Sequence, residues 1–320
     1  MLETIFFGSP EFAVPSLLAL AADARYHVGL VVTQPDRGAG RGRRPQPPPV
    51  KVAALERGLP VWQPPTLRAS EPEERLAALA PDLFVVVAYG EILRRRVLAV
   101  PRNGALNVHP SLLPELRGAS PIPAAILAGR GETGVSLIRL EARLDAGPIV
   151  AQRAVPLHGH ETAAELSDRL ARIAAEMLPD TGAAWCAGAL AALPQEESRA
   201  SYTQRLDKVD GLLDWRGSSG SLERRVRAMT PWPGAWSTLS GERVLIEQAA
   251  GGPELLGVPA GGIVIRQNRV LVRCGAGSLE LQRVRPAGRG SMDAAAWLRG
   301  LRAEGQPHFD PLPLAVTSQR

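Results

Sequence analysis

Two polar side chains of complementary chemistry, Asn107 and His109, lie two residues apart near the middle of the chain. They follow the apolar run 83–88, and residues 105–109 have the character of a second buried strand. Because side chains alternate along a strand, positions 107 and 109 project from the same face. A carboxamide can polarise a carbonyl and an imidazole can move a proton, so the pair is suited to acyl transfer without a covalent intermediate. The alternative for this pair alone is structural, a hydrogen-bonded core histidine beside a turn-forming asparagine.

A carboxylate that could act on the imidazole is Asp145, which lies in the glycine-bearing turn Leu144–Pro148. A carboxylate beside His109 would orient the ring and favour its charged form. An acidic residue in such a turn is often only a turn former, and the sequence alone does not bring the two side chains together. Ser111 is a conceivable nucleophile, but no base lies at a supporting spacing, so we expect the acceptor to attack directly.

Four arginines fall within eight residues of a glycine- and proline-rich segment, at Arg37, Arg41, Arg43 and Arg44. The glycines between them disfavour a stable helix or a packed strand, so we expect a segment that an anion would order. Arginine side chains fork onto phosphate oxygens. The segment follows the apolar run 28–33, at the carboxyl end of an expected parallel strand, where such sheets place their sites. We therefore favour an anion-binding segment over a solvated surface loop.

The elements that position these residues alternate between apolar runs and helical spacing. Strands are expected at 4–7, 28–33, 83–88 and 105–109, with a helix over 12–20. This strand–helix–strand order implies right-handed parallel crossovers. The turn at 8–10 lacks the repeated glycines of a dinucleotide fingerprint, which disfavours a nicotinamide cofactor. The pattern predicts an α/β domain with a mostly parallel sheet over residues 1–187.

The character of the chain changes after residue 187. A polar stretch over 188–205 is expected to be a linker. Short apolar segments separated by glycines follow it, at 244–246, 262–265, 270–272 and 279–284. Strands at this spacing are typical of a small β-barrel. We therefore expect a second domain over 206–312 and a loose tail over 313–320.

Composition narrows the classes of function further. The 320 residues are 45% hydrophobic and 22% charged, and no apolar run reaches the ~18 residues of a membrane span. The two cysteines, Cys186 and Cys274, and the five histidines form no metal-ligand or redox spacing, so we expect no metal and a cytoplasmic location. The net charge is +5, and residues 206–320 carry 15 Lys and Arg against 11 Asp and Glu, which fits a polyanionic partner.

These motifs together resemble the 10-formyltetrahydrofolate-dependent formyltransferase family, from about Ile5 to about Arg302. The family core is matched by Asn107-x-His109 with Ser111-Leu112-Leu113-Pro114, by Arg117-Gly118-Ala119-x-Pro121-Ile122, and by Leu144-Asp145-x-Gly147. Three further features look like the methionyl-tRNA formyltransferases within that family: Thr33-Gln34-Pro35-Asp36-Arg37 with Gly40-Arg41-Gly42, Pro231-Trp232-Pro233 with Trp236, and Pro286-Ala287-Gly288 before Met292.

The resemblance implies a Rossmann-like formyl-transfer domain followed by a small OB-like β-barrel domain that helps to hold tRNA. The implied reaction moves the formyl group of 10-formyltetrahydrofolate to the α-amino group of methionyl initiator tRNA. Its product, N-formylmethionyl-tRNA, serves translation initiation. In the expected mechanism the neutral amine attacks the formyl carbon directly. Asn107 and a protonated His109 donate hydrogen bonds to the developing oxyanion, and Asp145 stabilises the imidazolium.

By residue match, the resemblance also implies roles for three sets of side chains. The catalytic set is Asn107, His109 and Asp145. The folate-binding set is Ser111, Leu112, Leu113 and Pro114, with Val87, Tyr89 and Gly90 walling the pterin site. The tRNA-binding set is Arg37, Arg41, Arg43 and Arg44, which would reach the acceptor end of the tRNA.

Two other functions stay open at this point. One is a formyltransferase or deformylase acting on a small molecule, such as a nucleotide sugar or a purine precursor. The other is an RNA-binding protein that shares the fold without the chemistry. The arginine segment and basic barrel argue against the first, and the three polar positions together argue against the second. The chain departs from the family pattern at Gly38, Glu115, Arg143 and Ala146, which affects loop rigidity and surface charge. No obligate protein partner is evident, and a monomer is expected.

Overall fold

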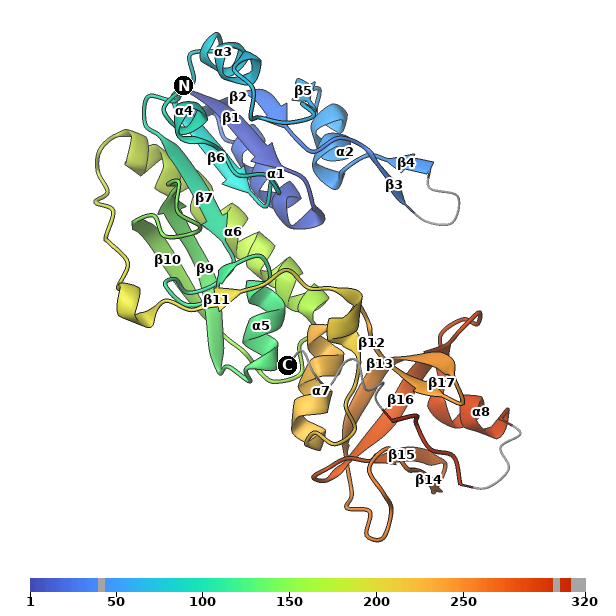
Figure 1. Cartoon of the computed structure of the whole chain (residues 1–320). Coiled ribbons are helices and arrows are strands. Elements are labelled where there is room, and N and C mark those ends of the chain that lie inside the picture. Colours follow the sequence, from blue (N-terminus) through green and yellow to red (C-terminus); the bar gives the residue numbers. More distant parts are fainter. Residues whose placement is uncertain (40–43, 302–305, 312–320) are drawn as a thin grey trace. The chain divides into compact units, whose positions relative to one another are not determined.

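The computed structural model describes residues 1–39, 44–301 and 306–311 (Figure 1). The chain divides into two compact units. The first comprises Met1–Pro121, Glu132–Pro156 and Leu166–Gln204, and the second comprises Ile122–Gly131, Leu157–Glu165 and Arg205–Arg320. The chain therefore leaves the first unit twice for short excursions before it continues in the second unit from Arg205.

The first unit is built on a seven-stranded sheet with strand order β10-β9-β7-β6-β1-β2-β5. Its strands are β1 (Leu2–Gly8), β2 (Tyr26–Val32), β5 (Val61–Trp62), β6 (Leu83–Val87), β7 (Ala105–His109), β9 (Glu132–Arg139) and β10 (Ile149–Pro156). Neighbours from β7 to β5 are parallel, whereas β9 is antiparallel to both β7 and β10. Every residue of β6 and β7 is buried, as apolar parallel strands require. The predicted α/β fold with a mostly parallel sheet is confirmed.

Helices connect these strands. They are η1 (Glu11–Ala13), α1 (Val14–Ala22), α2 (Pro49–Glu56), α3 (Glu71–Ala77), α4 (Arg95–Leu98), α5 (Pro121–Leu127) and α6 (Ala163–Cys186). Phe7 of β1 and Phe84 of β6 pack with ring centroids 5.0 Å apart, inside a core cluster that also contains Leu76 of α3 and Val97 of α4. Of the helices in the described part of the chain, the 24-residue α6 included, none is long and apolar enough to cross a membrane.

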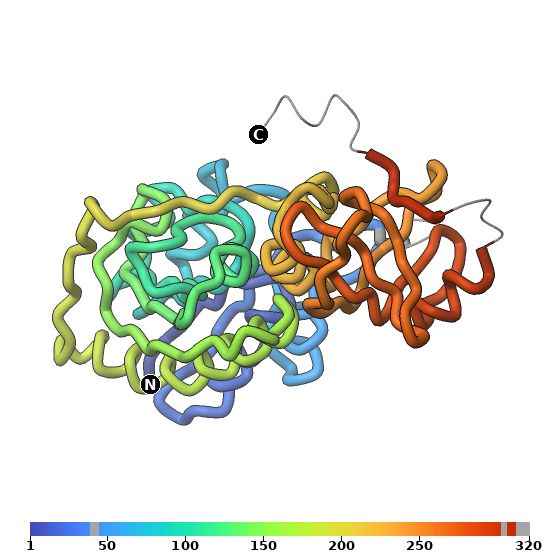
Figure 2. The backbone as a smooth tube through the Cα atoms, turned by 90° about the horizontal axis from the view of Figure 1, so that it is seen from below, coloured from blue at the N-terminus to red at the C-terminus, as the bar shows by residue number. Residues whose placement is uncertain are grey.

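The segment after α6 returns along the first unit (Figures 1 and 2). Leu193 exchanges backbone hydrogen bonds with Ile149 at the start of β10, with N···O distances of 2.8 and 2.7 Å. After η2 (Glu197–Arg199), the short strand β11 (Tyr202–Thr203) pairs parallel with β8 (Arg117–Gly118). Residues up to Gln204 thus belong to the first unit, which differs from the linker expected over 188–205. Polar composition suggested a linker, but here the polar groups serve hydrogen bonds within the unit.

The second unit contains a six-stranded antiparallel sheet. Its strands are β12 (Ala235–Leu239), β13 (Glu242–Gly252), β14 (Ile263–Arg266), β15 (Arg269–Arg273), β16 (Ser278–Pro286) and β17 (Met292–Asp293). The unit also contains η3 (Lys208–Gly211), α7 (Ser219–Ala228) and α8 (Ala294–Arg299). The indole of Trp215 stacks on Phe309 with ring centroids 4.8 Å apart, so residues near the carboxyl end complete this core. The predicted second domain of antiparallel strands is confirmed; the tail expected over 313–320 lies outside the described residues.

Candidate active site

The strand β7 ends in the two polar residues that the sequence singled out. Asn107 and His109 are 8% and 4% exposed, so both side chains lie inside the first unit. Asn107 pairs with Val86 on one side of the strand, and His109 pairs with Ser136 on the other. Alternation along β7 places Ala105, Asn107 and His109 on one face of the sheet. The carboxamide and the imidazole are therefore neighbours by strand geometry.

The imidazole of His109 has a fixed orientation. Its Nε2 lies 2.9 Å from the carbonyl oxygen of Leu116, and a carbonyl can only accept a hydrogen bond, so Nε2 carries the proton. Its Nδ1 lies 3.7 Å from Oδ2 of Asp145. In the neutral ring, Nδ1 then has the free lone pair. This nitrogen is on the side of the ring where the Asp145 carboxylate lies.

Burial decides the charge of this ring. The buried environment lowers the pKa of His109 below its ordinary value of 6.5, although the charge of Asp145 and the Leu116 carbonyl oppose that shift. Burial therefore favours the neutral ring, whereas Asp145 favours the protonated His109 expected from the sequence. A neutral ring whose Nε2–H is already bound offers Nδ1 as a base, rather than a charged donor.

The position of the Asp145 carboxylate depends on a hydrogen bond to its side chain and on the backbone conformation of the turn. Its Oδ2 accepts the backbone N–H of Gly118 at 2.8 Å. The backbone of Asp145 has φ 47°, a left-handed conformation that non-glycine residues rarely adopt. At Gly147 an added Cβ would lie 1.8 Å from the carbonyl oxygen of Arg139, so this position of the turn requires glycine. The turn thus brings Asp145 and His109 together, which the sequence could propose but not establish.

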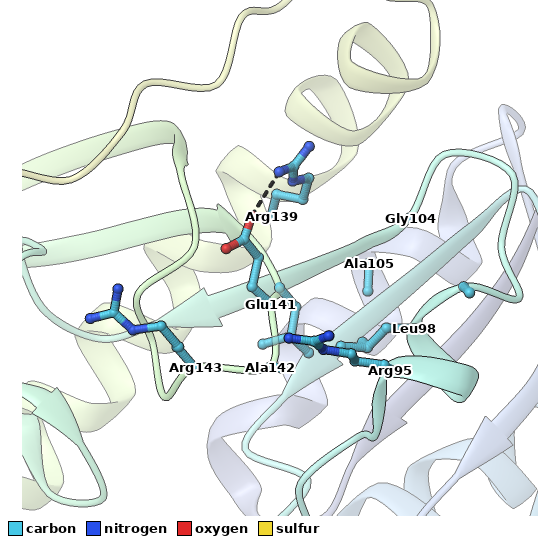
Figure 3. Close-up of a pocket in the computed structure, with 10 residues that line it drawn as sticks. Arg95, Leu98, Gly104, Ala105, Arg139, Glu141, Ala142 and Arg143 are labelled. Atoms are coloured by element: carbon cyan, nitrogen blue, oxygen red, sulfur yellow. Dashed lines mark hydrogen bonds and ion pairs between the residues drawn. The ribbon is translucent and has the colours of Figure 1, made fainter.

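The first unit also contains a pocket of about 460 Å³ (Figure 3). It is lined by Arg95, Leu98, Ala99, Gly104, Ala105 and 139–143. The lining joins the end of α4, the start of β7 and the loop after β9. Arg139 pairs with Glu141 at 2.7 Å, and Arg143 points toward Glu197, 2.8 Å away. Two lining residues are close in sequence to the polar cluster: Ala105 lies two residues before Asn107 on β7, and Arg143 lies two residues before Asp145.

Two family models match this chain. "Formyl transferase" matches residues 3–182, and "Formyl transferase, C-terminal domain" matches residues 205–302. The chain belongs to the formyl transferase family. It is 47% identical over 305 residues to the methionyl-tRNA formyltransferase of Roseiflexus castenholzii, covering 95% of this chain and 97% of that relative. It is 46% identical over 305 residues to that of Methylococcus capsulatus, covering 95% and 99%.

Solved structures with a similar fold include two that hold a folate compound. The N-formyltransferase from Helicobacter canadensis, in complex with folinic acid and dTDP-3-aminofucose, aligns with a TM-score of 0.66 at 17% identity, covering 88% of this chain and 99% of that one. HypX from Aquifex aeolicus, in complex with tetrahydrofolic acid, aligns with a TM-score of 0.62 at 18% identity, covering 97% of this chain and 51% of that one. At these identities the likeness is one of fold.

The segment Ser111, Leu112, Leu113 and Pro114, expected to bind folate, uses its polar groups internally. The Ser111 hydroxyl donates to the carbonyl of Glu115 at 2.7 Å, and the Ser136 hydroxyl donates to the carbonyl of Ser111 at 2.6 Å. The backbone N–H of Leu113 donates to the Ser136 hydroxyl at 3.1 Å. These bonds shape the loop between His109 and Leu116. They also commit the Ser111 hydroxyl, which agrees with a reaction that needs no serine nucleophile.

The end of β6, also expected at the folate site, presents backbone rather than side chains. Val87 is fully buried and Tyr89 is 2% exposed, with its ring 5.6 Å from that of Phe7. Gly90 follows with φ 89°. None of the residues of the expected folate set lines the pocket described above. Sequence reasoning missed that pocket because Leu98, Ala105 and Leu140 look like core residues; the available signal was the position of Ala105 on the face of Asn107.

The arginine segment forms a hairpin in the part that the structure describes. β3 (Arg37–Ala39) pairs antiparallel with β4 (Arg44–Gln46), a pairing that the sequence did not predict; the described residues 37–38 and 45–46 are exposed rather than packed in a core. Backbone pairing depends little on the side chains, which is why arginines and glycines did not prevent it. Arg37 is exposed. Arg41 and Arg43 lie outside the described residues.

An ion pair anchors the base of this hairpin. Lys51 Nζ lies 2.8 Å from both carboxylate oxygens of Asp36, and the Gln63 amide donates to Asp36 at 2.7 Å. The bonds from Lys51 and Gln63 hold the pKa of Asp36 below its ordinary value of 3.8. The hairpin is thus attached to α2 and to the residue after β5. Across the described residues, no three His, Cys, Asp or Glu side chains gather to hold a metal ion.

The site geometry predicts how His109 titrates. In ¹⁵N-histidine NMR spectra, we expect His109 to be the Nε2–H tautomer and to have a pKa below 6.5, because burial disfavours the imidazolium. Asp145→Asn should lower that pKa further, since it removes the negative charge that attracts the proton. His109→Gln assigns the resonance, because the chain has four other histidines. A His109 pKa above 6.5 would contradict this account.

Proposed function

We propose that this chain transfers the formyl group of 10-formyltetrahydrofolate to the α-amino group of methionyl initiator tRNA, yielding N-formylmethionyl-tRNA and tetrahydrofolate. The choice of methionyl-tRNA as the acceptor rests on the 46–47% identity to methionyl-tRNA formyltransferases. That identity extends over nearly the whole chain and includes both units. The reaction requires an amine acceptor, an acyl donor and a base, and the candidate site supplies a base beside a pocket. Because the acceptor is a tRNA, we expect the enzyme to be cytoplasmic. We also expect it to act as a monomer.

The polar cluster supports a direct attack of the amine. As the neutral methionyl amine bonds to the formyl carbon, Nδ1 of His109 takes the proton that the amine loses. Negative charge develops on the formyl oxygen, and the carboxamide of Asn107 donates a hydrogen bond to it. One such donor contributes about 3 kcal/mol to transition-state stabilisation. When the bond to N10 breaks, the imidazolium returns the proton to N10.

Asp145 gives this proton cycle its electrostatic support. The carboxylate lies 3.7 Å from Nδ1, the nitrogen that becomes charged, so it stabilises the imidazolium while the intermediate exists. The ground state keeps the ring neutral, because burial disfavours the charge before the amine arrives. His109 therefore gains its proton only when the reaction supplies one, which is the behaviour required of a general base.

The pocket in Figure 3 is suited to the pterin ring of the folate. Its volume of about 460 Å³ is within the range of small-molecule sites. Leu98, Ala105 and Leu140 offer apolar contact to a flat ring, and the arginines at its rim suit an anionic donor. Because Ala105 and Arg143 of its lining lie two residues before Asn107 and Asp145, we place the N10-formyl group toward the polar cluster. The loop Ser111–Pro114 and the end of β6 do not line this pocket and remain proposed folate contacts.

The tRNA would meet the arginine hairpin and the basic second unit. Arg37 is exposed on a hairpin whose base is anchored through Asp36 and Lys51. Residues 206–320 carry the surplus of positive charge that a phosphate backbone attracts. We therefore assign Arg37, Arg41, Arg43 and Arg44 to the acceptor end of the tRNA.

The proposed function is tested by formyl transfer from 10-formyltetrahydrofolate to methionyl initiator tRNA, with methionyl elongator tRNA and a reaction without tRNA as controls. We expect rapid transfer to the initiator tRNA and little without tRNA. Folate turnover in the absence of tRNA would instead indicate a small-molecule formyltransferase or deformylase. Binding of tRNA without any turnover would indicate an RNA-binding protein.

The donor pocket yields a further prediction. Ala142 is exposed on the loop that lines the pocket, so Ala142→Trp should fold normally while the indole fills part of the space. We expect the KM for 10-formyltetrahydrofolate to rise about tenfold or more, because the ring loses its apolar contacts. The affinity for methionyl-tRNA, measured by filter binding, should stay unchanged. An unaltered KM for the donor would place the pterin elsewhere.

The arginine hairpin predicts a salt effect. Arg37→Ala should weaken binding of methionyl-tRNA, and the slope of log affinity against log salt should fall by about 0.9, as expected for one lost phosphate contact. Arg172→Ala is the matched control, because Arg172 is an exposed arginine on α6, away from the hairpin. If both variants show the same slope as the parent protein, Arg37 makes no phosphate contact.

A further inference from the structure

Arg117 is the largest fully buried side chain of the described residues, with 0% exposure. Its guanidinium donates to both carboxylate oxygens of Glu197, at 3.0 and 3.1 Å, and to the Tyr202 hydroxyl at 3.0 Å. It also donates twice to Oε1 of Gln195, at 3.0 and 2.9 Å. A buried charge is costly unless it is paired in this way. Three partners in the segment after α6 therefore enclose one arginine of β8.

Gln195 connects this arginine to the turn of Asp145. Its amide nitrogen donates to the backbone carbonyls of Asp145, at 2.8 Å, and of Gly147, at 2.7 Å. The guanidinium of Arg117 has only donors and the two carbonyls have only acceptors. A carboxamide satisfies both sides at once, with its oxygen toward Arg117 and its nitrogen toward the turn. A glutamate here would direct an oxygen at two carbonyls, and a methionine would satisfy neither side.

The turn that Gln195 holds is one that requires support. Asp145 has φ 47°, a conformation that costs a non-glycine residue about 1–3 kcal/mol and persists when its surroundings enforce it. Gln195 binds the backbone of the turn, while the N–H of Gly118 binds the Asp145 carboxylate. Gly118 is the residue next to Arg117, so both contacts come from one local assembly. Together they fix the carboxylate 3.7 Å from Nδ1 of His109.

We propose that Gln195 is a positioning residue for the formyl transfer: by binding the carbonyls of Asp145 and Gly147, it holds the Asp145 carboxylate beside His109. The inference rests on the proposed function and extends it to a residue that touches neither substrate. It also assigns the segment after α6 a part in the reaction. Losing Gln195 displaces a charge and leaves the base and the oxyanion donor in place.

The test compares Gln195→Glu with Gln195→Met and with Glu196→Gln. The first keeps an acceptor for Arg117 but opposes the two carbonyls, and the second removes all four hydrogen bonds. Glu196→Gln is the matched control, because the Glu196 side chain is exposed on the same segment and its carboxylate accepts a hydrogen bond from the Ser198 hydroxyl. We expect kcat to fall roughly 10- to 100-fold in both Gln195 variants, as a small misplacement of a catalytic group does, with the KM for methionyl-tRNA within twofold.

Two readouts separate positioning from a general loss of structure. In Gln195→Glu the His109 pKa should fall as it does in Asp145→Asn, because the carboxylate no longer lies close to the ring. In an Asp145→Asn background, Gln195→Glu should cause little further loss of kcat, since both changes act through the same carboxylate. Thermal unfolding of each variant shows whether it is folded. If Gln195→Glu is not folded, the same two measurements are made on Gln195→Met.

The proposal is overturned if a folded Gln195 variant keeps the parent kcat and the parent His109 titration, or if its effect adds fully to that of Asp145→Asn. Failure of the proposed function would look different. The parent protein would then not formylate methionyl-tRNA, while the His109 titration of Gln195→Glu against the parent would still decide whether Gln195 holds the carboxylate.

Discussion

The hydrogen bond from His109 to the carbonyl of Leu116 is the interaction on which the chemistry of this site depends. A carbonyl accepts and cannot donate, so it fixes the proton on Nε2 and leaves Nδ1 as the basic nitrogen. Burial lowers the pKa of the ring and so favours its neutral form. Leu116 itself has φ 59°, and its N–H donates to the Ser201 hydroxyl at 2.9 Å. The tautomer of one ring is thus set by the path of the backbone around it.

That backbone path is enforced from the segment after α6. Ser201 holds Leu116, β11 pairs with β8, and Gln195 binds the turn of Asp145. Buried Arg117 ties these contacts together, since its charge must be met by several acceptors at once. Asn107 and His109 come from β7, but the backbone around them is held by residues about ninety positions later in the chain. The site is therefore a property of the whole first unit.

The sequence predicted those features that depend on local pattern. The strands that became β6 and β7 follow from continuous apolar runs, and alternation places Asn107 and His109 on one face. Features that depend on tertiary contact were beyond its reach. The pocket is lined by residues such as Leu98, which resembles any core leucine, and the tautomer of His109 depends on a carbonyl. Polar composition indicated a linker where Gln195 makes hydrogen bonds within the first unit.

The central claim is that Nδ1 of His109 is the base, and His109→Gln tests it most directly. A glutamine can still donate an amide N–H toward the Leu116 carbonyl, but it has no basic nitrogen in the position of Nδ1. Single-turnover transfer from 10-formyltetrahydrofolate to methionyl initiator tRNA should slow by about 10²- to 10⁴-fold, with binding of both substrates retained. A rate close to that of the parent protein, in a folded variant that binds both substrates, would contradict the account.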